Sequence, residues 1–104
     1  MKKIARLGPQ SELSQEFDHK AIRRTAKALK SYLLELDPHE DTYGLRENIL
    51  PIVEDALAGR LKLPFDDRNE PLRNEGTVGL LPREYMRISA PFWLHITGGL
   101  YGAT

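Results

Sequence analysis

A long amphipathic segment, residues 14–36, constrains the fold of this chain more than any other feature. At about 100° per residue, its apolar side chains fall on one side of a helix and its cations on the opposite side. The apolar side holds Ile22, Thr25, Ala26, Leu29, Tyr32, Leu33 and Leu36. The cationic stripe holds Lys20, Arg23, Arg24, Lys27 and Lys30, with no acid among them. We therefore expect a helix that is capped by Ser14, ends before Asp37-Pro38 and buries one face in a core.

A second helical pattern follows the loop at residues 38–42. Asp41 or Thr42 can cap this helix, and Gly59 suits the position just after its end. Pro51 falls inside the pattern and removes one helical hydrogen bond. Apolar residues nevertheless share one face on both sides of the proline, which favours a single bent helix. They are Leu45, Ile49, Ile52, Val53, Ala56 and Leu57.

Two short segments are typical of strands. Residues 61–65 alternate between apolar and other residues, and Pro64 would restrict them to the edge of a sheet. Residues 92–97, with the sequence FWLHIT, are rich in aromatic and β-branched residues, and Phe92, Leu94 and Ile96 would share a face with the core. Pro82 predicts the start of a short third helix, and Pro91 its end. Residues 66–81 are either an unusually long irregular segment or contain structure that the pattern does not reveal.

These elements together predict an α+β fold. Two main helices and a short third helix would pack with a small antiparallel sheet of about two strands. The 104 residues, 40% hydrophobic and 29% charged, suit one globular domain over residues 1–104. We expect residues 1–13 to form a loose N-terminal arm and residues 98–104 a frayed tail.

Composition narrows the possible compartments and ligands. The chain contains no cysteine, so it can form neither a disulfide framework nor a thiolate metal site. No apolar run approaches the length that spans a bilayer, and the basic start leads into no hydrophobic segment. We therefore expect a cytoplasmic protein with no membrane partner, no metal and no cofactor.

Catalytic motifs are missing from the sequence. The chain has no H-E-x-x-H pair, no nucleophile elbow, no Walker loop and no dinucleotide-binding glycine pattern. His39 and His95 could meet as the general acid and base of a metal-free nuclease. A solvated loop histidine and a packed one explain the same residues more simply, so we expect no enzyme.

Charge is segregated along the chain although the net charge is zero. Residues 1–34 hold eight Lys or Arg and three acids, a net charge of +5. Residues 35–59 hold seven acids and one Arg, a net charge of −6. The two segments could pair within the molecule, but exposed pairs contribute only about 0–1 kcal/mol each. Such segregation also suits a protein that meets a charged partner, because local fields steer association.

The acidic segment leads to the first functional hypothesis, an inhibitor or immunity-type protein that occludes a partner protein such as a toxic nuclease. Acidic side chains would imitate phosphates in the cationic site of that partner and speed association. Trp93, together with Tyr43, would supply the apolar anchor if its face of the strand is open; otherwise Trp93 belongs to the core. The proposed acidic contacts are Asp37, Glu40, Asp41, Glu47, Glu54 and Asp55.

The cationic stripe leads to the alternative hypothesis, a small nucleic-acid-binding protein. Five cations on about 120° of a helix could follow a phosphate backbone. A charged stripe can also be no more than the wet face of a helix. The two hypotheses predict opposite mutational responses, because one depends on the acids and the other on the cations.

Overall fold

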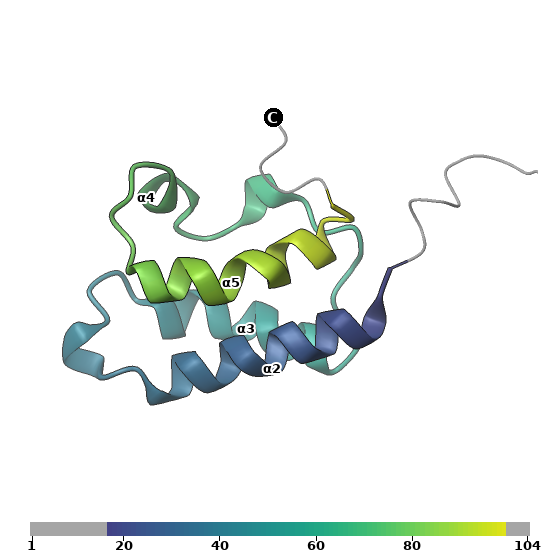
Figure 1. The fold of residues 1–104 in the computed structure, drawn as a ribbon, viewed down its shortest axis with the longest axis horizontal. Helices are drawn as coiled ribbons and strands as arrows, with labels where there is room; N and C mark the ends of the chain where they lie inside the picture. The colour runs from purple at the N-terminus through teal and green to yellow at the C-terminus, as the bar shows by residue number, and fades with distance from the viewer. Residues whose placement is uncertain (1–16, 100–104) are drawn as a thin grey trace, which may run out of the picture.

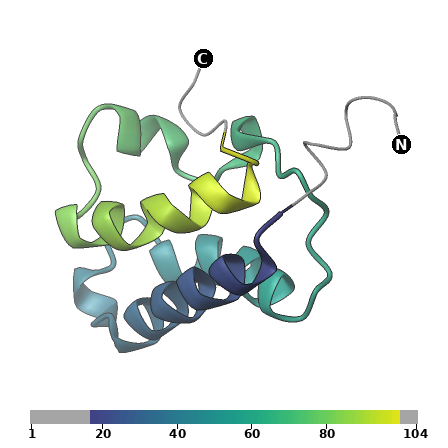
Figure 2. The same cartoon turned by 45° about the vertical axis from the view of Figure 1, so that its right-hand side comes forward.

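The structure, a computed structural model, describes residues 17–99, and the regular elements in this part of the chain are all helices. Three helices form its body: α2 (His19–Glu35), α3 (Leu45–Leu57) and α5 (Arg83–Ile96). A short helix, α4 (Arg73–Thr77), and two 3-10 helices, η1 (Pro38–Glu40) and η2 (Asp67–Asn69), lie in the connections. α2 packs against both α3 and α5 and runs antiparallel to them (Figure 1). The same arrangement, with α5 beside α2 and α3 behind, is visible in Figure 2.

The α2 helix buries the predicted face. Ile22, Ala26, Leu29 and Leu33 are at most 4% exposed, and Tyr32 and Leu36 pack at the edge of the core. The helix starts later than predicted, because the Asp18 carboxylate accepts a hydrogen bond from the Ala21 N–H at 3.0 Å and caps it there. Ser14, the predicted cap, lies outside the described residues, as does the predicted arm at residues 1–13.

The α3 helix is continuous through Pro51, as predicted, and the ring of this proline is exposed. Leu45, Ile49 and Val53 lie on the buried face. Asp41 satisfies the first turn, since its carboxylate accepts hydrogen bonds from the N–H groups of Leu45 at 2.5 Å and Arg46 at 3.1 Å. The prediction of a capping role for Asp41 is therefore confirmed, although Gly44 occupies the N-cap position itself.

The predicted α+β fold is wrong, because no strand occurs between residues 17 and 99. Residues 61–65 are an extended connection whose odd-numbered side chains are half-buried and whose even-numbered side chains are exposed. The alternation arises because this extended segment lies along the helices, with every second side chain against the core, and no neighbouring strand is involved. The Phe65 N–H donates a hydrogen bond to the Ile96 carbonyl oxygen at 2.8 Å, which ties this connection to the end of α5.

In the second predicted strand, residues 92–96 form the C-terminal part of α5, and Thr97 is its C-cap. Phe92, Trp93 and Ile96 are buried, whereas Leu94 is 44% exposed, so the spacing of buried residues follows a helical period. Pro91 does not end the helix. It lies on the exposed face, where water can satisfy the carbonyl group that its missing N–H leaves free. Strand propensity was the weaker signal here, since it depends on a partner strand that this fold does not supply.

The segment 66–81 contains structure that its sequence pattern hid. η2 and α4 both lie in it, and Arg73 and Asp67 form an ion pair at 3.2 Å. Beyond α5, Gly98 and Gly99 form a turn in which their N–H groups bond back to His95 and Leu94. The rest of the predicted tail, residues 100–104, lies outside the described part of the chain.

Candidate nucleic-acid interface

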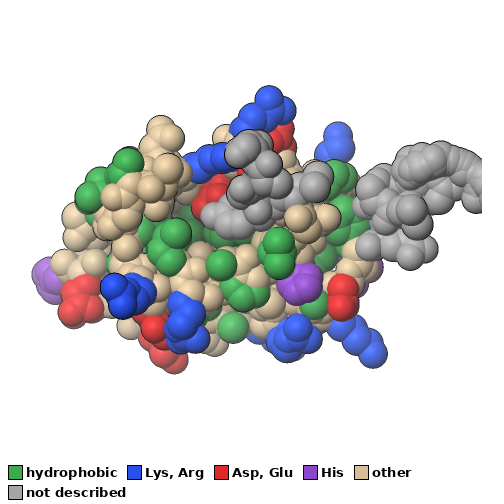
Figure 3. Space-filling model, turned by 45° about the horizontal axis from the view of Figure 1, so that its top comes forward, with side chains coloured by type: hydrophobic (Ala, Val, Ile, Leu, Met, Phe, Trp, Pro, Cys, Tyr) green, Lys and Arg blue, Asp and Glu red, His purple; other side chains and the backbone are tan. Residues whose placement is uncertain are grey.

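The cationic stripe forms one exposed face of α2, here called the basic face: Lys20, Arg23, Arg24, Lys27 and Lys30. The opposite side of the helix is buried, so the fold orients these cations outward. In Figure 3 Lys and Arg side chains project along the lower edge of the molecule, where α2 lies below α5. Lys20 and Lys27 are seven residues apart, which is about 10 Å along a helix.

Only one member of the basic face has an acidic partner among the described residues. Lys30 Nζ lies 3.5 Å from Glu54 Oε2, and both side chains are partly exposed, so this pair is worth about 0–1 kcal/mol. Lys20, Arg23, Arg24 and Lys27 form no ion pair with any residue between 17 and 99. These four cations therefore keep their charge available to a partner.

The acid nearest the start of the basic face is already committed to the helix. The Ala21 N–H is the main cause that lowers the pKa of Asp18; desolvation opposes it, and nearby His95 and Arg24 lower the pKa further. Asp18 is thus ionised at neutral pH, and its carboxylate is held at the helix N-terminus, where it does not cover the cations.

A depression of about 530 Å³ borders this face and is lined by His19, Lys20, Arg23, Arg24 and Lys27. All of these described lining residues come from one helix. The depression consequently lacks a facing described wall that could bring catalytic groups together.

The acidic segment is divided among several local roles. Asp37 accepts the His39 N–H at 2.9 Å, and Asp41 caps α3. Glu54 pairs with Lys30, and Asp55 Oδ1 lies 2.9 Å from Arg60 Nη2. Glu40 and Glu47 are exposed, but on different elements, η1 and α3. Most of these acids therefore already cap helices or form ion pairs within the molecule.

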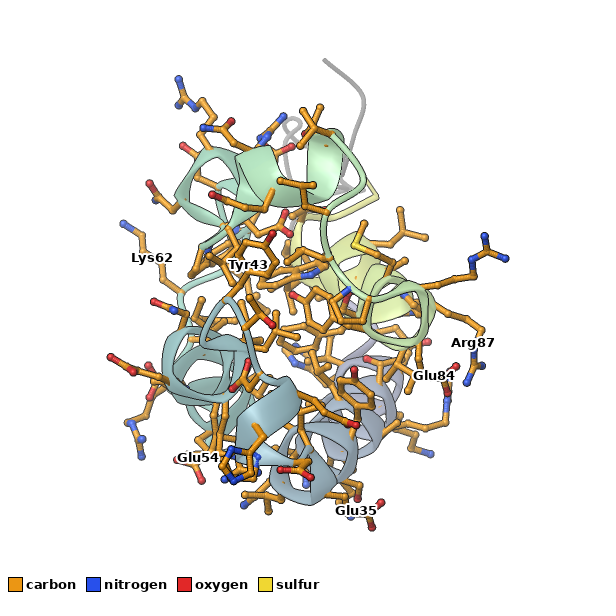
Figure 4. The ribbon with its side chains drawn as sticks, turned by 90° about the vertical axis from the view of Figure 1, so that its left-hand side faces the viewer. Glu35, Tyr43, Glu54, Lys62, Glu84 and Arg87 are labelled. Carbon is orange, nitrogen blue, oxygen red and sulfur yellow. The ribbon has the colours of Figure 1, made fainter. Side chains whose placement is uncertain are left out.

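The two predicted anchors both point to the core. Trp93 is 1% exposed, with its ring centroid 5.8 Å from that of Phe65 and 5.3 Å from that of Phe92. Tyr43 is half-buried and packs against the core, and Figure 4 shows it directed inward while Glu54 and Lys62 point outward. The prediction of Trp93 as a surface anchor is therefore wrong; its alternative placement in the core is confirmed.

The histidine pair of the nuclease hypothesis is not assembled. His39 is in η1, and His95 is in the last turn of α5, and these elements lie at opposite ends of the molecule (Figure 1). Within residues 17–99 no group of three metal-binding side chains is placed to hold an ion. Over the same range no helix has both the length and the apolar character needed to cross a membrane.

Two smaller hollows, of about 370 and 390 Å³, border the connection before η2. The charged residues on their walls are Asp66, Asp67 and Arg68 in the first hollow and Lys62 and Asp66 in the second. Asp66 and Arg68 bind each other through several hydrogen bonds. The Arg68 side chain is the main reason that the pKa of Asp66 falls to about 2. Asp66 and Arg68 neutralise each other, and Asp67 forms an ion pair with Arg73, so little unpaired charge remains in the first hollow.

Sequence reasoning missed two features. The first is a cluster of buried polar side chains: Tyr85, Ser89 and Glu70 are all at most 8% exposed. Burial raises the pKa of Tyr85 to about 12. Val78 and Leu80 are 67% and 54% exposed in the loop between α4 and α5. An apolar residue on each side of Gly79 was the available signal for that loop, but exposure of this kind depends on packing.

Comparison with known proteins identifies no relative. No family model matches the chain, and no curated protein or solved structure matches it. Function must therefore be inferred from the geometry of the molecule itself.

Proposed function

We propose that this protein binds nucleic acid through the basic face of α2. The observation that supports the proposal is the set of four exposed cations, Lys20, Arg23, Arg24 and Lys27, that share one helical face and have no acidic partner among the described residues. Lys and Arg arranged in this way bind phosphates and release the counterions condensed on the polymer.

The inhibitor hypothesis has less support. Its apolar anchor, Trp93, is in the core, and Asp41, Glu54 and Asp55 already have partners within the molecule. A buried aromatic anchor usually dominates the energy of such an interface, so an inhibitor would need another one. That hypothesis stays a prediction without a defined surface.

Salt dependence gives a quantitative test. Four phosphate contacts predict that the logarithm of the association constant falls with the logarithm of salt concentration with a slope of about −3.6 on duplex DNA. Affinity should then fall about 150-fold between about 50 and 200 mM salt. Fluorescence anisotropy of labelled nucleic acid titrated with the protein measures both quantities.

A charge-reversal pair tests whether the basic face is responsible. We expect Arg23→Glu with Lys27→Glu to abolish binding, because two contacts become repulsive. The matched control is Lys62→Glu with Arg83→Glu, which makes the same change in net charge at two exposed cations away from α2. If both double variants lose affinity equally, net charge and not the basic face governs binding. If the unaltered protein binds no nucleic acid at low salt, the proposed function is wrong.

A further inference from the structure

We infer that the nucleic acid bound by this protein is B-form duplex DNA, and that the N-terminal half of α2 enters its major groove. This inference rests on the proposed function and specifies its ligand. It draws on four observations: the placement of aromatic side chains, the accessibility of α2, the distribution of cations around the helix and the position of two acids near its C-terminal end.

The aromatic side chains of the described residues are not available to stack on bases. Every aromatic residue between 17 and 99 is buried or half-buried, and none belongs to the basic face. They are Phe17, Tyr32, Tyr43, Phe65, Tyr85, Phe92 and Trp93. Proteins that hold single strands gain about 1–3 kcal/mol per base from such stacking. A duplex, whose bases already stack on each other, does not require it.

The shape of α2 fits one groove in particular. A helix with its side chains is about 10–12 Å across, and the major groove of B-form DNA is about 12 Å wide. The corresponding groove of A-form RNA is too deep and narrow to be read by side chains. Figure 4, which looks nearly along the helices, shows α2 at a corner of the three-helix arrangement, so its outer face can approach a groove.

The cations are distributed over both flanks of that outer face. Arg23 and Arg24 are consecutive and therefore point about 100° apart around the axis. Lys20 and Lys27 project between them. A helix lying in the groove with this arrangement can reach phosphates on both strands at once, which a single strand cannot offer.

Acidic side chains restrict contact to the N-terminal half of α2. Glu54 takes up Lys30, and Glu35, the last residue of the helix, is exposed. Figure 4 shows both side chains pointing outward, Glu35 below α2 and Glu54 beside α3. Their charge would repel a phosphate backbone, and the exposed carboxylate of Asp18 sets the same limit at the start of the helix, so contact should be made by the segment from Lys20 to Lys27.

The test compares three labelled ligands of one sequence: duplex DNA, duplex RNA and single-stranded DNA. We expect duplex DNA to bind about tenfold or more tightly than the single strand. The unpaired bases of a single strand would find no aromatic side chain to stack on, and the loss of one such stacking contact weakens binding by roughly that factor. We also expect a ligand that fills the minor groove to leave binding unchanged.

A gain-of-function variant tests the placement of α2. Glu35→Lys should tighten binding to duplex DNA and steepen the salt slope by about one. The matched control, Glu75→Lys, makes the same charge change on α4 and should alter the slope less.

The possible outcomes separate the two proposals. If the single strand or duplex RNA binds as tightly as duplex DNA, and Arg23→Glu with Lys27→Glu abolishes that binding, the inference is wrong while the proposed function stands. If no ligand binds, both are wrong. An equal effect of Glu35→Lys and Glu75→Lys would overturn the placement of α2 in the groove.

Discussion

Replacement of Trp93 by alanine should destabilise the protein strongly. Trp93 is 1% exposed and lies against the rings of Phe65 and Phe92, so its removal leaves a cavity between α5 and the 61–65 connection. An exposed anchor at the same position would cost the isolated protein almost nothing when truncated. The measured loss of stability therefore distinguishes a core residue from an interface residue.

The expected magnitude follows from the buried area. A tryptophan buries about 150–250 Å², which at about 25 cal/mol per Å² corresponds to about 4–6 kcal/mol. Alanine recovers part of this, and measured losses for such replacements are about 3–5 kcal/mol. Because domains usually have a free energy of unfolding of about 5–15 kcal/mol, the variant would lose about a fifth of its stability or more.

Urea unfolding followed by circular dichroism measures this difference without relying on the tryptophan signal. Leu94→Ala is the matched control, since Leu94 is the next residue of α5 but is 44% exposed, and it should cost less than about 1 kcal/mol. Trp93 is the only tryptophan of the chain, so its fluorescence in the unaltered protein should be that of a buried indole. A loss below about 1 kcal/mol for Trp93→Ala, or emission typical of water, would refute the reasoning.

Two further predictions concern polar contacts in the helical body. Arg46 donates hydrogen bonds to the carbonyl oxygens of Leu33 (2.8 Å), Leu34 (3.3 Å) and Leu36 at the end of α2. Arg46→Met should therefore destabilise the protein by about 1.5–3 kcal/mol in the same urea assay. A loss below about 0.5 kcal/mol would contradict this capping role. Burial raises the pKa of Tyr85 to about 12, so the neutral hydroxyl stabilises the fold fully below pH 10, and this contribution, about 3 kcal/mol, should be lost as pH rises from 10 through 12. The free energy of unfolding of Tyr85→Phe should fall less steeply with pH between 10 and 12 than that of the unaltered protein. An unchanged pH dependence would show that another group controls it.

The α2 helix and its two faces could be predicted from sequence because the information is local. Its apolar residues recur every three or four positions from Ile22 to Leu36, about four turns, which is the spacing of a buried helical face. The cations then fall on the outer side by the same geometry. The proposed binding face therefore follows from the sequence, and the structure adds that four of its cations have no acidic partner among the described residues.

The 92–97 segment shows where sequence reasoning failed. Its aromatic and β-branched residues suit a strand, and Pro91 suits a helix end, but both preferences are small compared with the burial of Phe92, Trp93 and Ile96 against α2 and its neighbours. The same packing decides that Trp93 is in the core, and the contact between α2 and α3 brings Glu54 to Lys30. Residue types and their period determined which helix carries the charge. Which side chains remain free to meet a partner was decided only by tertiary structure, because burial and pairing depend on elements that are distant in the sequence.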